Sequence, residues 1–418
     1  MVETSTTSHQ ELLVRQLPDS QKNGKTWLIR LRKQYLATSS HVTLTLFFTY
    51  GVSLKNWAES GLLHREIRLY QELVQRHGVK VQFLTYGDAS DRQWEKELQG
   101  ISLIPVYEGR SRSRFRLLAL FQSLIIPWVV RNKLRQTDIF KTNQIKGGWV
   151  AVISKWMFHK PLLVRCGYEY YDFARKRGRS TIVQIFSRIM SRLIYSHADQ
   201  IHVATSSDFQ LIVDLFGVSP QIIRVCPNWV DHSTFKPFGL IRRKNILCVG
   251  RLTKQKNMPL LFEALRGTGL RLDILGEGTE RAYLENFARE NDLSVEFLGR
   301  VPNDQMPDLY NRYSVFVICS LYEGNPKTLL EAMACGCAVI GTNVPGIREL
   351  INHEKNGLLL LENPDDLQNG IMKLMADEAL RNTLSQQARQ DILETNSLES
   401  ALDVEYRVYS QLINQTIK

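Results

Sequence analysis

One stretch of the sequence, residues 314–341, constrains the fold more than any other. It begins with a short apolar run, 314–319, rich in β-branched and aromatic residues and typical of a buried strand of a parallel sheet. Pro326 suits a first helical turn, and apolar residues then recur at helical spacing until Gly336. A second apolar run, 338–341, predicts another strand. The stretch therefore predicts a β–α–β unit, whose ligands bind at the carboxyl ends of the strands beside the helix N-terminus.

Two carboxylates in this stretch, Glu323 in the loop and Glu331 in the helix, are poorly explained by packing. Glu331 stands among apolar helix positions, where an unpartnered glutamate is rare; the alternative is an ordinary solvated helix residue. The free backbone N–H groups at Lys327 and Thr328 favour negative charge between the two carboxylates. A ligand with a diphosphate in its middle and hydroxyl groups at both ends would satisfy this arrangement. The stretch therefore predicts a nucleotide-sugar site.

The residues around these carboxylates resemble the donor-site signature of the retaining glycosyltransferases of family 4, the group 1 glycosyltransferases, which have the GT-B fold. The match consists of Glu323, Gly324, Pro326, Glu331, Ala332, Met333, Ala334 and Gly336, continued by Pro345, Gly346 and Glu349. The resemblance covers roughly residues 40–415 and is strongest over 245–360. It implies an α/β chain with two Rossmann-like, doubly wound parallel-sheet domains that face each other across a cleft.

The chain divides into four parts on this interpretation. Residues 1–38 form a polar leader, 39–235 an acceptor-binding Rossmann-like domain, 236–396 a donor-binding Rossmann-like domain, and 397–418 a helix that packs back on the first domain. The boundary near 235 follows the sequence Pro-Asn-Trp-Val-Asp at 227–231, which resembles the family's Pro-Asn-Gly-Val-Asp crossing with Trp229 in place of the glycine. The first 24 residues lack the apolar segment of a secretory signal, so we expect a cytoplasmic protein.

Charge and cysteine content narrow the classes of partner. Residues 1–240 carry 33 Lys or Arg against 18 Asp or Glu, whereas 241–418 carry 20 against 24. The first half of the chain is therefore the part that should meet an anionic surface or acceptor. Nucleic-acid binding would explain this charge but not the donor-site signature. The six cysteines form no CxxC pair and stand mostly in apolar runs, which favours buried thiols in a reducing compartment over disulfides or zinc.

A basic and apolar segment, residues 110–135, raises the question of a membrane. Four arginines precede an apolar run at 117–130, and three more basic residues follow it. The run is too short for a bilayer span, which needs about 20 residues. Because it is apolar nearly all round, we expect a helix buried in the first domain rather than one inserted in a membrane. The flanking cations could still rest on anionic headgroups. The aromatic and basic residues at 168–179 suit a membrane interface, a lipid-diphosphate acceptor or an ordinary exposed loop and helix start.

Further site residues follow from the resemblance. Arg251 and Lys256, after the first strand of the second domain, match the family's basic pair that holds the donor diphosphate, and fixed cations can stabilise the leaving phosphate without a metal. The complete donor-side set is Gly250, Arg251, Lys256, Val301, Glu323, Gly324, Asn325, Pro326, Lys327, Thr328 and Glu331, of which Arg251, Lys256 and Glu323 are the catalytic candidates. No Asp-x-Asp motif is present, so we expect no metal and no cofactor beyond the sugar nucleotide itself.

The acceptor side is predicted from looser matches. Gly61 stands where the family places a glycine loop near the reacting sugar, and Arg165, Tyr168 and Glu169 should reach the cleft. Many relatives carry a histidine at the end of this strand, near the reaction centre; Gly167 occupies that place here, so the role is not carried over.

The sequence thus predicts a metal-independent retaining glycosyltransferase, a hexosyltransferase. It would transfer a sugar from a nucleoside-diphosphate sugar to a saccharide or lipid-linked acceptor in polysaccharide or glycolipid synthesis. We expect it in the cytoplasm or bound peripherally at the cytosolic face of a membrane, with no nucleic-acid partner. The alternatives are a nucleotide-sugar epimerase of the same fold or a catalytically silent nucleotide-sugar-binding protein.

Overall fold

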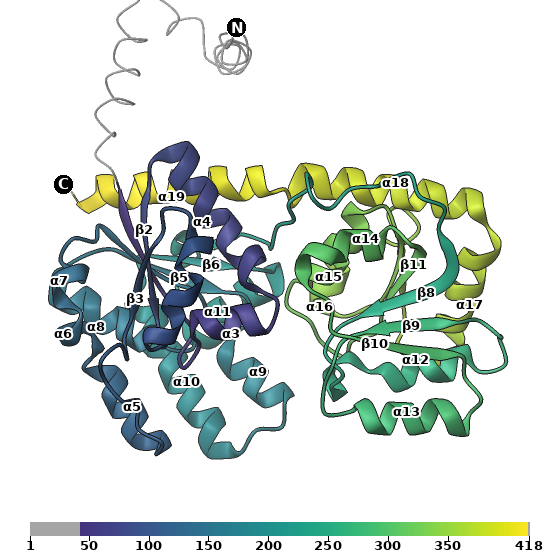
Figure 1. Ribbon diagram of the computed structural model, residues 1–418, viewed down its shortest axis with the longest axis horizontal. Helices are drawn as coiled ribbons and strands as arrows, with labels where there is room; N and C mark the ends of the chain where they lie inside the picture. The colour runs from purple at the N-terminus through teal and green to yellow at the C-terminus, as the bar shows by residue number, and fades with distance from the viewer. Residues whose placement is uncertain (1–41, 417–418) are drawn as a thin grey trace, which may run out of the picture. The chain divides into compact units, whose positions relative to one another are not determined.

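The computed structural model describes residues 42–416, and the described part contains two parallel β-sheets (Figure 1). The predicted leader, residues 1–38, lies outside the described residues. The first sheet has seven strands in the order β3-β2-β1-β4-β5-β6-β7. Its strands are β1 (Thr43–Phe47), β2 (Lys80–Thr85), β3 (Ser102–Pro105), β4 (Ile139–Thr142), β5 (Leu162–Cys166), β6 (Gln200–Val203) and β7 (Ile223–Val225).

The second sheet has six strands in the order β10-β9-β8-β11-β12-β13. Its strands are β8 (Arg243–Val249), β9 (Leu272–Leu275), β10 (Val295–Gly299), β11 (Tyr313–Ile318), β12 (Ala338–Thr342) and β13 (Leu358–Leu360). In each sheet the strand order changes direction beside the first strand, between β1 and β4 and between β8 and β11. These are the switch points at which doubly wound sheets bind ligands. The predicted α/β class with two Rossmann-like units is confirmed.

Helices connect the parallel strands in both sheets. We call β1 to β7 with their helices, residues 43–225, the N-lobe, and residues 243–395 the C-lobe. The N-lobe helices are α3 (Leu54–Glu59), α4 (Leu63–His77), α5 (Arg116–Leu124), α6 (Ile126–Val129), α7 (Arg131–Leu134), α8 (Gly148–Phe158), α9 (Tyr170–Lys176), α10 (Thr181–Ser196) and α11 (Ser206–Phe216). The C-lobe helices are α12 (Met258–Leu265), α13 (Arg281–Glu290), α14 (Met306–Tyr310), α15 (Lys327–Ala334), α16 (Pro345–Arg348), α17 (Pro364–Ala376) and α18 (Glu378–Thr395).

The predicted β–α–β stretch is the centre of the C-lobe. It forms β11, α15 and β12, and Pro326 is the residue immediately before α15. Val315, Val317 and the other strand residues are buried because helices cover both faces of this sheet. Leu329, Leu330 and Met333 of α15 pack into the core on one of these faces. Hydrophobic packing therefore fixes α15 and aims its N-terminus at the carboxyl ends of β8 and β11.

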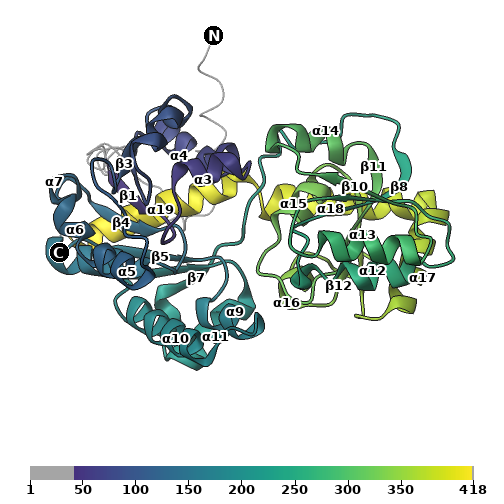
Figure 2. The ribbon, with the colours of Figure 1, turned by 60° about the horizontal axis from the view of Figure 1, so that its bottom comes forward.

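The last helix, α19 (Leu398–Thr416), leaves the C-lobe and packs on α4 and β4 of the N-lobe (Figures 1 and 2). Lys141 of β4 is 2% exposed, and its Nζ lies 2.7 Å from Glu405 Oε1 and 3.2 Å from the Tyr409 hydroxyl, both on α19. Burial lowers the pKa of Lys141, and the charge of Glu405 opposes that shift. A lysine buried this deeply needs its partner, so α19 completes the N-lobe.

The segment 110–135 differs from the prediction of one helix buried in the first domain. It forms three short helices, α5, α6 and α7, with breaks at Ile125 and Val130. Phe115, Leu117 and Phe121 are 73%, 72% and 63% exposed. The prediction is wrong because the helices pack on the lobe along one side only, and an apolar run without a polar face then leaves apolar side chains outside. Within residues 42–416, no helix combines the length and apolar character needed to cross a membrane.

Candidate functional site

A cleft of about 960 Å³ lies between the two lobes and is lined by residues of both. Its walls are built where strands end. Asn143 follows β4 and Gly167 follows β5 in the N-lobe, while Gly250 follows β8 and Gly276 follows β9 in the C-lobe. Both sheets therefore direct their carboxyl ends into one space, where doubly wound folds bind ligands.

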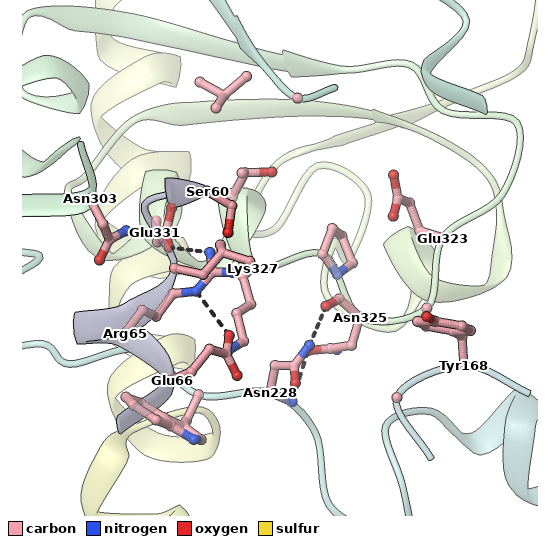
Figure 3. A pocket seen from close by; sticks show the side chains of 18 of the residues that line it. Ser60, Arg65, Glu66, Tyr168, Asn228, Asn303, Glu323, Asn325, Lys327 and Glu331 are labelled. Carbon is pink, nitrogen blue, oxygen red and sulfur yellow. Dashed lines mark hydrogen bonds and ion pairs between the residues drawn. The ribbon is translucent and has the colours of Figure 1, made fainter. Parts of the chain in front are cut away.

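The cleft brings together fourteen of the fifteen residues predicted from the sequence. They are Gly61, Arg165, Tyr168, Gly250, Arg251, Lys256, Val301, Glu323, Gly324, Asn325, Pro326, Lys327, Thr328 and Glu331. Figure 3 shows Glu323 and Tyr168 toward one end of the cleft, and Glu331, Lys327, Arg65 and Glu66 grouped toward the other.

Glu169 is the exception, and the prediction that it reaches the cleft is wrong. Its side chain is 1% exposed and caps α9 by accepting a hydrogen bond from the backbone N–H of Asp172 at 2.6 Å. It also accepts a hydrogen bond from Ser191 of α10 at 2.6 Å. Burial raises the pKa of Glu169 to about 7, although these hydrogen bonds oppose the shift. Glu169 therefore joins two helices behind the cleft wall.

Lys256 and Glu323 form an ion pair on the C-lobe wall. Glu323 also accepts a hydrogen bond from the Ser320 hydroxyl at 2.7 Å, so its carboxylate is held in place from two sides. A Cβ at position 250 would lie 3.0 Å from Lys256 Cε, and glycine at this position leaves room for the lysine chain to cross the end of β8. The pair places a cation and a carboxylate on the cleft surface at the switch point of the sheet.

Arg251 lines the same cleft, and its guanidinium has no counter-ion among residues 42–416. Its side chain is exposed, and it forms no ion pair or hydrogen bond with any residue from 42 to 416. The Tyr168 phenol from the N-lobe is close enough to respond to it: burial raises the pKa of Tyr168, and the charges of Arg177 and Arg251 oppose that shift. An unpaired guanidinium in a cleft is suited to bind phosphate oxygens.

Glu331 of α15 is 3% exposed and is held by residues of both lobes. Its Oε2 accepts a hydrogen bond from the Tyr310 hydroxyl at 3.0 Å, and its Oε1 lies 3.5 Å from Arg65 Nη1 on α4. Burial raises the pKa of Glu331, while Arg65 and Tyr310 oppose that shift. The carboxylate is thus partnered, which excludes the alternative of a solvated helix residue.

Lys327, at the first position of α15, also reaches across the cleft. Its Nζ lies 2.7 Å from Glu66 Oε1 on α4 and 5.7 Å from the centre of the Trp229 ring (Figure 3). Burial alone would raise the pKa of Glu66, but Lys327 and Arg65 outweigh it and lower the pKa to about 2. Because the side chain of Lys327 is engaged here, the positive charge left at the start of α15 comes from its backbone amides.

The loop before α15 contacts both the segment that connects the lobes and the N-lobe itself. Asn325 accepts a hydrogen bond from the backbone N–H of Asn228 at 3.0 Å, and its carbonyl oxygen accepts one from the Asn228 amide at 2.6 Å. A Cβ at Gly324 would lie 2.5 Å from the carbonyl oxygen of Gly167. Glycine is therefore required at 324 because the N-lobe backbone comes this close.

Several residues of the cleft were missed in the sequence. Gln144 accepts a hydrogen bond from the backbone N–H of Gly167 at 2.9 Å and fills the space into which a side chain at 167 would extend. Its position directly after a strand was a usable signal. Arg65 and Glu66 gave none, since adjacent opposite charges on an amphipathic helix look like a solvated face. Arg165 was predicted, but its guanidinium contacts the segment after β7, where it lies 3.1 Å from Asn228 Oδ1.

Metal ligands are not gathered at this site. Between residues 42 and 416, no group of three or more His, Cys, Asp or Glu side chains is arranged to hold a metal ion. The groups suited to an anionic ligand are Arg251, Lys256 and the backbone amides at the start of α15.

Comparisons with known proteins agree with this geometry. The model of the family described as glycosyl transferases group 1 matches residues 234–391, and that of the glycosyl transferase 4-like domain matches residues 64–229. Among solved structures, Anabaena HepE in complex with UDP and glucose superimposes with a TM-score of 0.71 at 16% identity, covering 89% of this chain and 100% of that one. At this identity the likeness concerns the GT-B fold.

Two curated relatives are similar in sequence. An uncharacterised glycosyltransferase of Methanocaldococcus jannaschii is 33% identical over 202 residues, and the match covers 46% of this chain and about half, 52%, of that relative. The second is the Campylobacter jejuni N-acetylgalactosamine-N,N'-diacetylbacillosaminyl-diphospho-undecaprenol 4-alpha-N-acetylgalactosaminyltransferase. It is 30% identical over 252 residues, and the match covers 58% of this chain and 68% of the relative.

Proposed function

We propose a reaction for this chain from one premise: it belongs to the group 1 glycosyltransferases. The reaction is transfer of a sugar from a nucleoside-diphosphate sugar to a saccharide or lipid-linked acceptor, with retention of the anomeric configuration and without a metal ion. The observation that carries the proposal is the grouping of Arg251, Lys256 and the amides of α15 at the switch point of the C-lobe sheet.

The donor diphosphate would bind where these positive groups converge. When the bond from the anomeric carbon to the diphosphate breaks, negative charge grows on the leaving phosphate, and Arg251, Lys256 and the amides of Lys327 and Thr328 would stabilise it. Glu323 would accept hydrogen bonds from hydroxyl groups of the transferred sugar. These groups are held before the ligand arrives, which is the condition for electrostatic catalysis.

The ribose of the nucleotide would meet Glu331, and the base would lie near Val301. Glu331 is already engaged by Arg65, so ribose hydroxyls would share or replace this contact from the opposite lobe. The acceptor hydroxyl would attack the anomeric carbon from the side of the leaving group, and its proton would pass to a phosphate oxygen. One glycosidic bond forms, one sugar–phosphate bond breaks, and the nucleoside diphosphate leaves.

The acceptor would lie against the N-lobe side of the cleft, near Gly61, Gln144 and Tyr168. The C. jejuni relative acts, by its name, on a sugar linked through diphosphate to undecaprenol. A lipid-linked acceptor is therefore the first class to test, with polysaccharide or glycolipid synthesis at the cytosolic face of a membrane as the setting. An epimerase or a silent binder would bind the nucleotide sugar but would not need an acceptor.

Thermal unfolding with a panel of nucleoside diphosphates and their sugars tests the donor site. A ligand at 100 times its dissociation constant should stabilise the protein by about 2.7 kcal/mol. Uridine nucleotides head the panel because Anabaena HepE holds UDP. Lys256→Ala and Glu331→Ala should lose the shift, whereas Lys254→Ala, an exposed lysine two residues away and outside the cleft, should keep it. Absence of a shift with every nucleotide would overturn the proposal.

Retention needs a separate measurement. Once a donor and an acceptor are found, proton NMR of the early product reports its anomeric configuration. The same configuration as the donor supports the proposal, and the opposite one refutes retention. Full activity in the presence of a chelator supports the metal-independent reaction, and loss of activity that a divalent cation restores refutes it.

A further inference from the structure

One surface of the N-lobe exposes an unusual number of large apolar side chains on neighbouring helices. They lie on and around α5 and α6, at Phe115, Leu117, Leu118, Phe121, Ile125 and Trp128, and on α10, at Ile182, Val183, Ile185 and Ile189. We call these ten side chains the apolar face. Ile182 and Phe121 are 80% and 63% exposed. Contiguous exposed apolar side chains of this kind mark an interaction site.

Helix α8 holds the two parts of the apolar face together. Trp149 of α8 donates a hydrogen bond from its indole nitrogen to the Ser123 hydroxyl on α5 at 2.9 Å, and its ring meets that of Phe186 on α10 at 6.4 Å. Figures 1 and 2 both show α5 and α10 side by side at the edge of the N-lobe. Ser123 of α5 and Ser187 of α10 are fully buried, and the opposite sides of these two helices, which carry Phe121, Ile182, Ile185 and Ile189, point outward.

Positive charge surrounds this face. Residues 110–135 contain seven Lys or Arg, residues 173–198 contain six, and neither segment contains an Asp or Glu. Lys146, just before α8, lies among Arg112, Arg116 and Arg179, whose charges add to burial in lowering its pKa. None of these four cations forms an ion pair within the described chain, so nothing there neutralises them.

The same helices lead to the cleft. The ring of Phe173 on α9 lies 4.4 Å from that of Tyr168, and both residues line the cleft. Arg177 covers the Phe173 ring at 4.3 Å from its centre, and Arg188 of α10 lies 5.8 Å from the centre of the Tyr171 ring. A chain of aromatic and basic side chains therefore runs from α10 to the N-lobe side of the site.

We propose that the apolar face and its cations dock on a lipid bilayer that contains anionic headgroups. The apolar side chains enter the boundary between headgroups and acyl chains, and the arginines contact lipid phosphates. Resting on the proposed function, this docking would place the cleft next to the headgroup of a lipid-linked acceptor. The charge selects this occupant over a second copy of the chain, because two such faces carry the same sign and repel each other.

Flotation with lipid vesicles tests the proposal. The wild type should float with vesicles of equal parts phosphatidylglycerol and phosphatidylcholine at low salt, and at least tenfold less with phosphatidylcholine alone. Phe121→Glu combined with Ile185→Glu, and separately Arg116→Glu combined with Arg179→Glu, should each reduce flotation at least tenfold. Leu361→Glu and Lys244→Glu are the controls, since they change an exposed leucine and an exposed lysine of the C-lobe and should float as the wild type does.

Three results would overturn the proposal: no flotation of the wild type, flotation of both double variants at the wild-type level, or equal loss in the C-lobe controls. Sedimentation without lipid gives a further test, because a dimer that the double variants abolish would make a second copy the occupant. These measurements need no sugar nucleotide. Nucleotide shifts in thermal unfolding should be the same for wild type and double variants, so failure of the membrane proposal and failure of the proposed function are distinguishable.

Discussion

The two lobes share a fold but differ in what they leave exposed. In the C-lobe the exposed large apolar residues, Tyr283, Leu321, Leu361 and Met372, stand on separate elements. In the N-lobe they gather on neighbouring helices, and Arg112, Arg116 and Arg179 beside them form no ion pair within the described chain. The C-lobe also pairs Lys256 and Glu323 from within its own sheet, whereas Lys141 of the N-lobe obtains its counter-ion from the last helix of the chain.

This difference indicates that the two lobes have different roles. The C-lobe supplies both partners of the Lys256–Glu323 pair, as suits a domain that, by our proposal, holds a soluble nucleotide. The N-lobe depends on other structures, with α19 covering β4 and α4 and, by our proposal, a bilayer covering α5 and α10.

The largest effect is expected when the N-lobe loses the support that α19 gives it. Glu405→Leu leaves Lys141 buried without a counter-ion, and loss of one partner of a buried pair costs about 3–5 kcal/mol of unfolding free energy. Urea unfolding measures it. The double variant Lys141→Met and Glu405→Leu should recover most of the loss, because apolar side chains of similar volume replace the pair. A double variant as unstable as the single one would refute the role of this ion pair.

A second variant tests whether Lys256 of the C-lobe stabilises the negative charge that develops in the transition state. Lys256→Ala should lower kcat by about 10²–10³, the usual cost of removing one preorganised group that stabilises developing charge. Steady-state kinetics measures this, and Lys254→Ala on the same loop should stay within twofold of the wild type. An unchanged kcat for Lys256→Ala would remove the lysine from the chemistry.

The link between α9 and α10 should depend on pH. Burial raises the pKa of Glu169 from 4.5 to about 7, so the native state holds this proton more tightly than the unfolded state does. The contribution of Glu169 to stability is therefore greatest below pH 4.5, falls as the pH rises through 7, and stays low above it. Relative to Glu169→Gln, the wild type should lose on the order of 2–3 kcal/mol between pH 4 and pH 8. Parallel unfolding curves for the two proteins would contradict this.

The smallest effect concerns the contact where the lobes meet. Gly324→Ala places a methyl group 2.5 Å from the carbonyl oxygen of Gly167, and overpacking of this kind costs about 1–3 kcal/mol. We expect transfer to slow by about tenfold while nucleotide binding, which we propose for the C-lobe, stays within about threefold. Gly167→Ala meets the flexible end of Gln144 and should lose less. Equal losses in binding and transfer would show that the contact serves the C-lobe alone.

The positions of the proposed donor-side residues could be predicted from the sequence because these residues are close together in the chain. Glu323, Lys327 and Glu331 belong to one β–α–β unit, whose strand, turn and helix signals are local. The strand 314–319 and the helix that follows it were placed within a residue or two for the same reason. Local spacing fixes which side chains face the end of such a unit.

The acceptor side could not be predicted as well, since its geometry depends on distant partners. Arg65 contacts Glu331, which is 266 residues later in the sequence, and no local sequence pattern predicts this contact. Glu169 stands in a polar turn and was expected at the cleft. A hydrogen bond from Ser191 of α10 instead holds its carboxylate in the interior of the lobe. The run 117–130 suggested burial because an apolar pattern does not distinguish a protein core from a surface that another structure covers.

The pairing of Lys141 with Glu405 also sets an order of events during synthesis. The N-lobe leaves the ribosome first, yet β4 carries a lysine whose counter-ion lies 264 residues later in the chain. Until α19 emerges, water has to reach that ammonium group, and the sheet cannot close over it. The half that is translated first should therefore be the last to reach its native state, and a chaperone that shields it would act until translation is nearly complete.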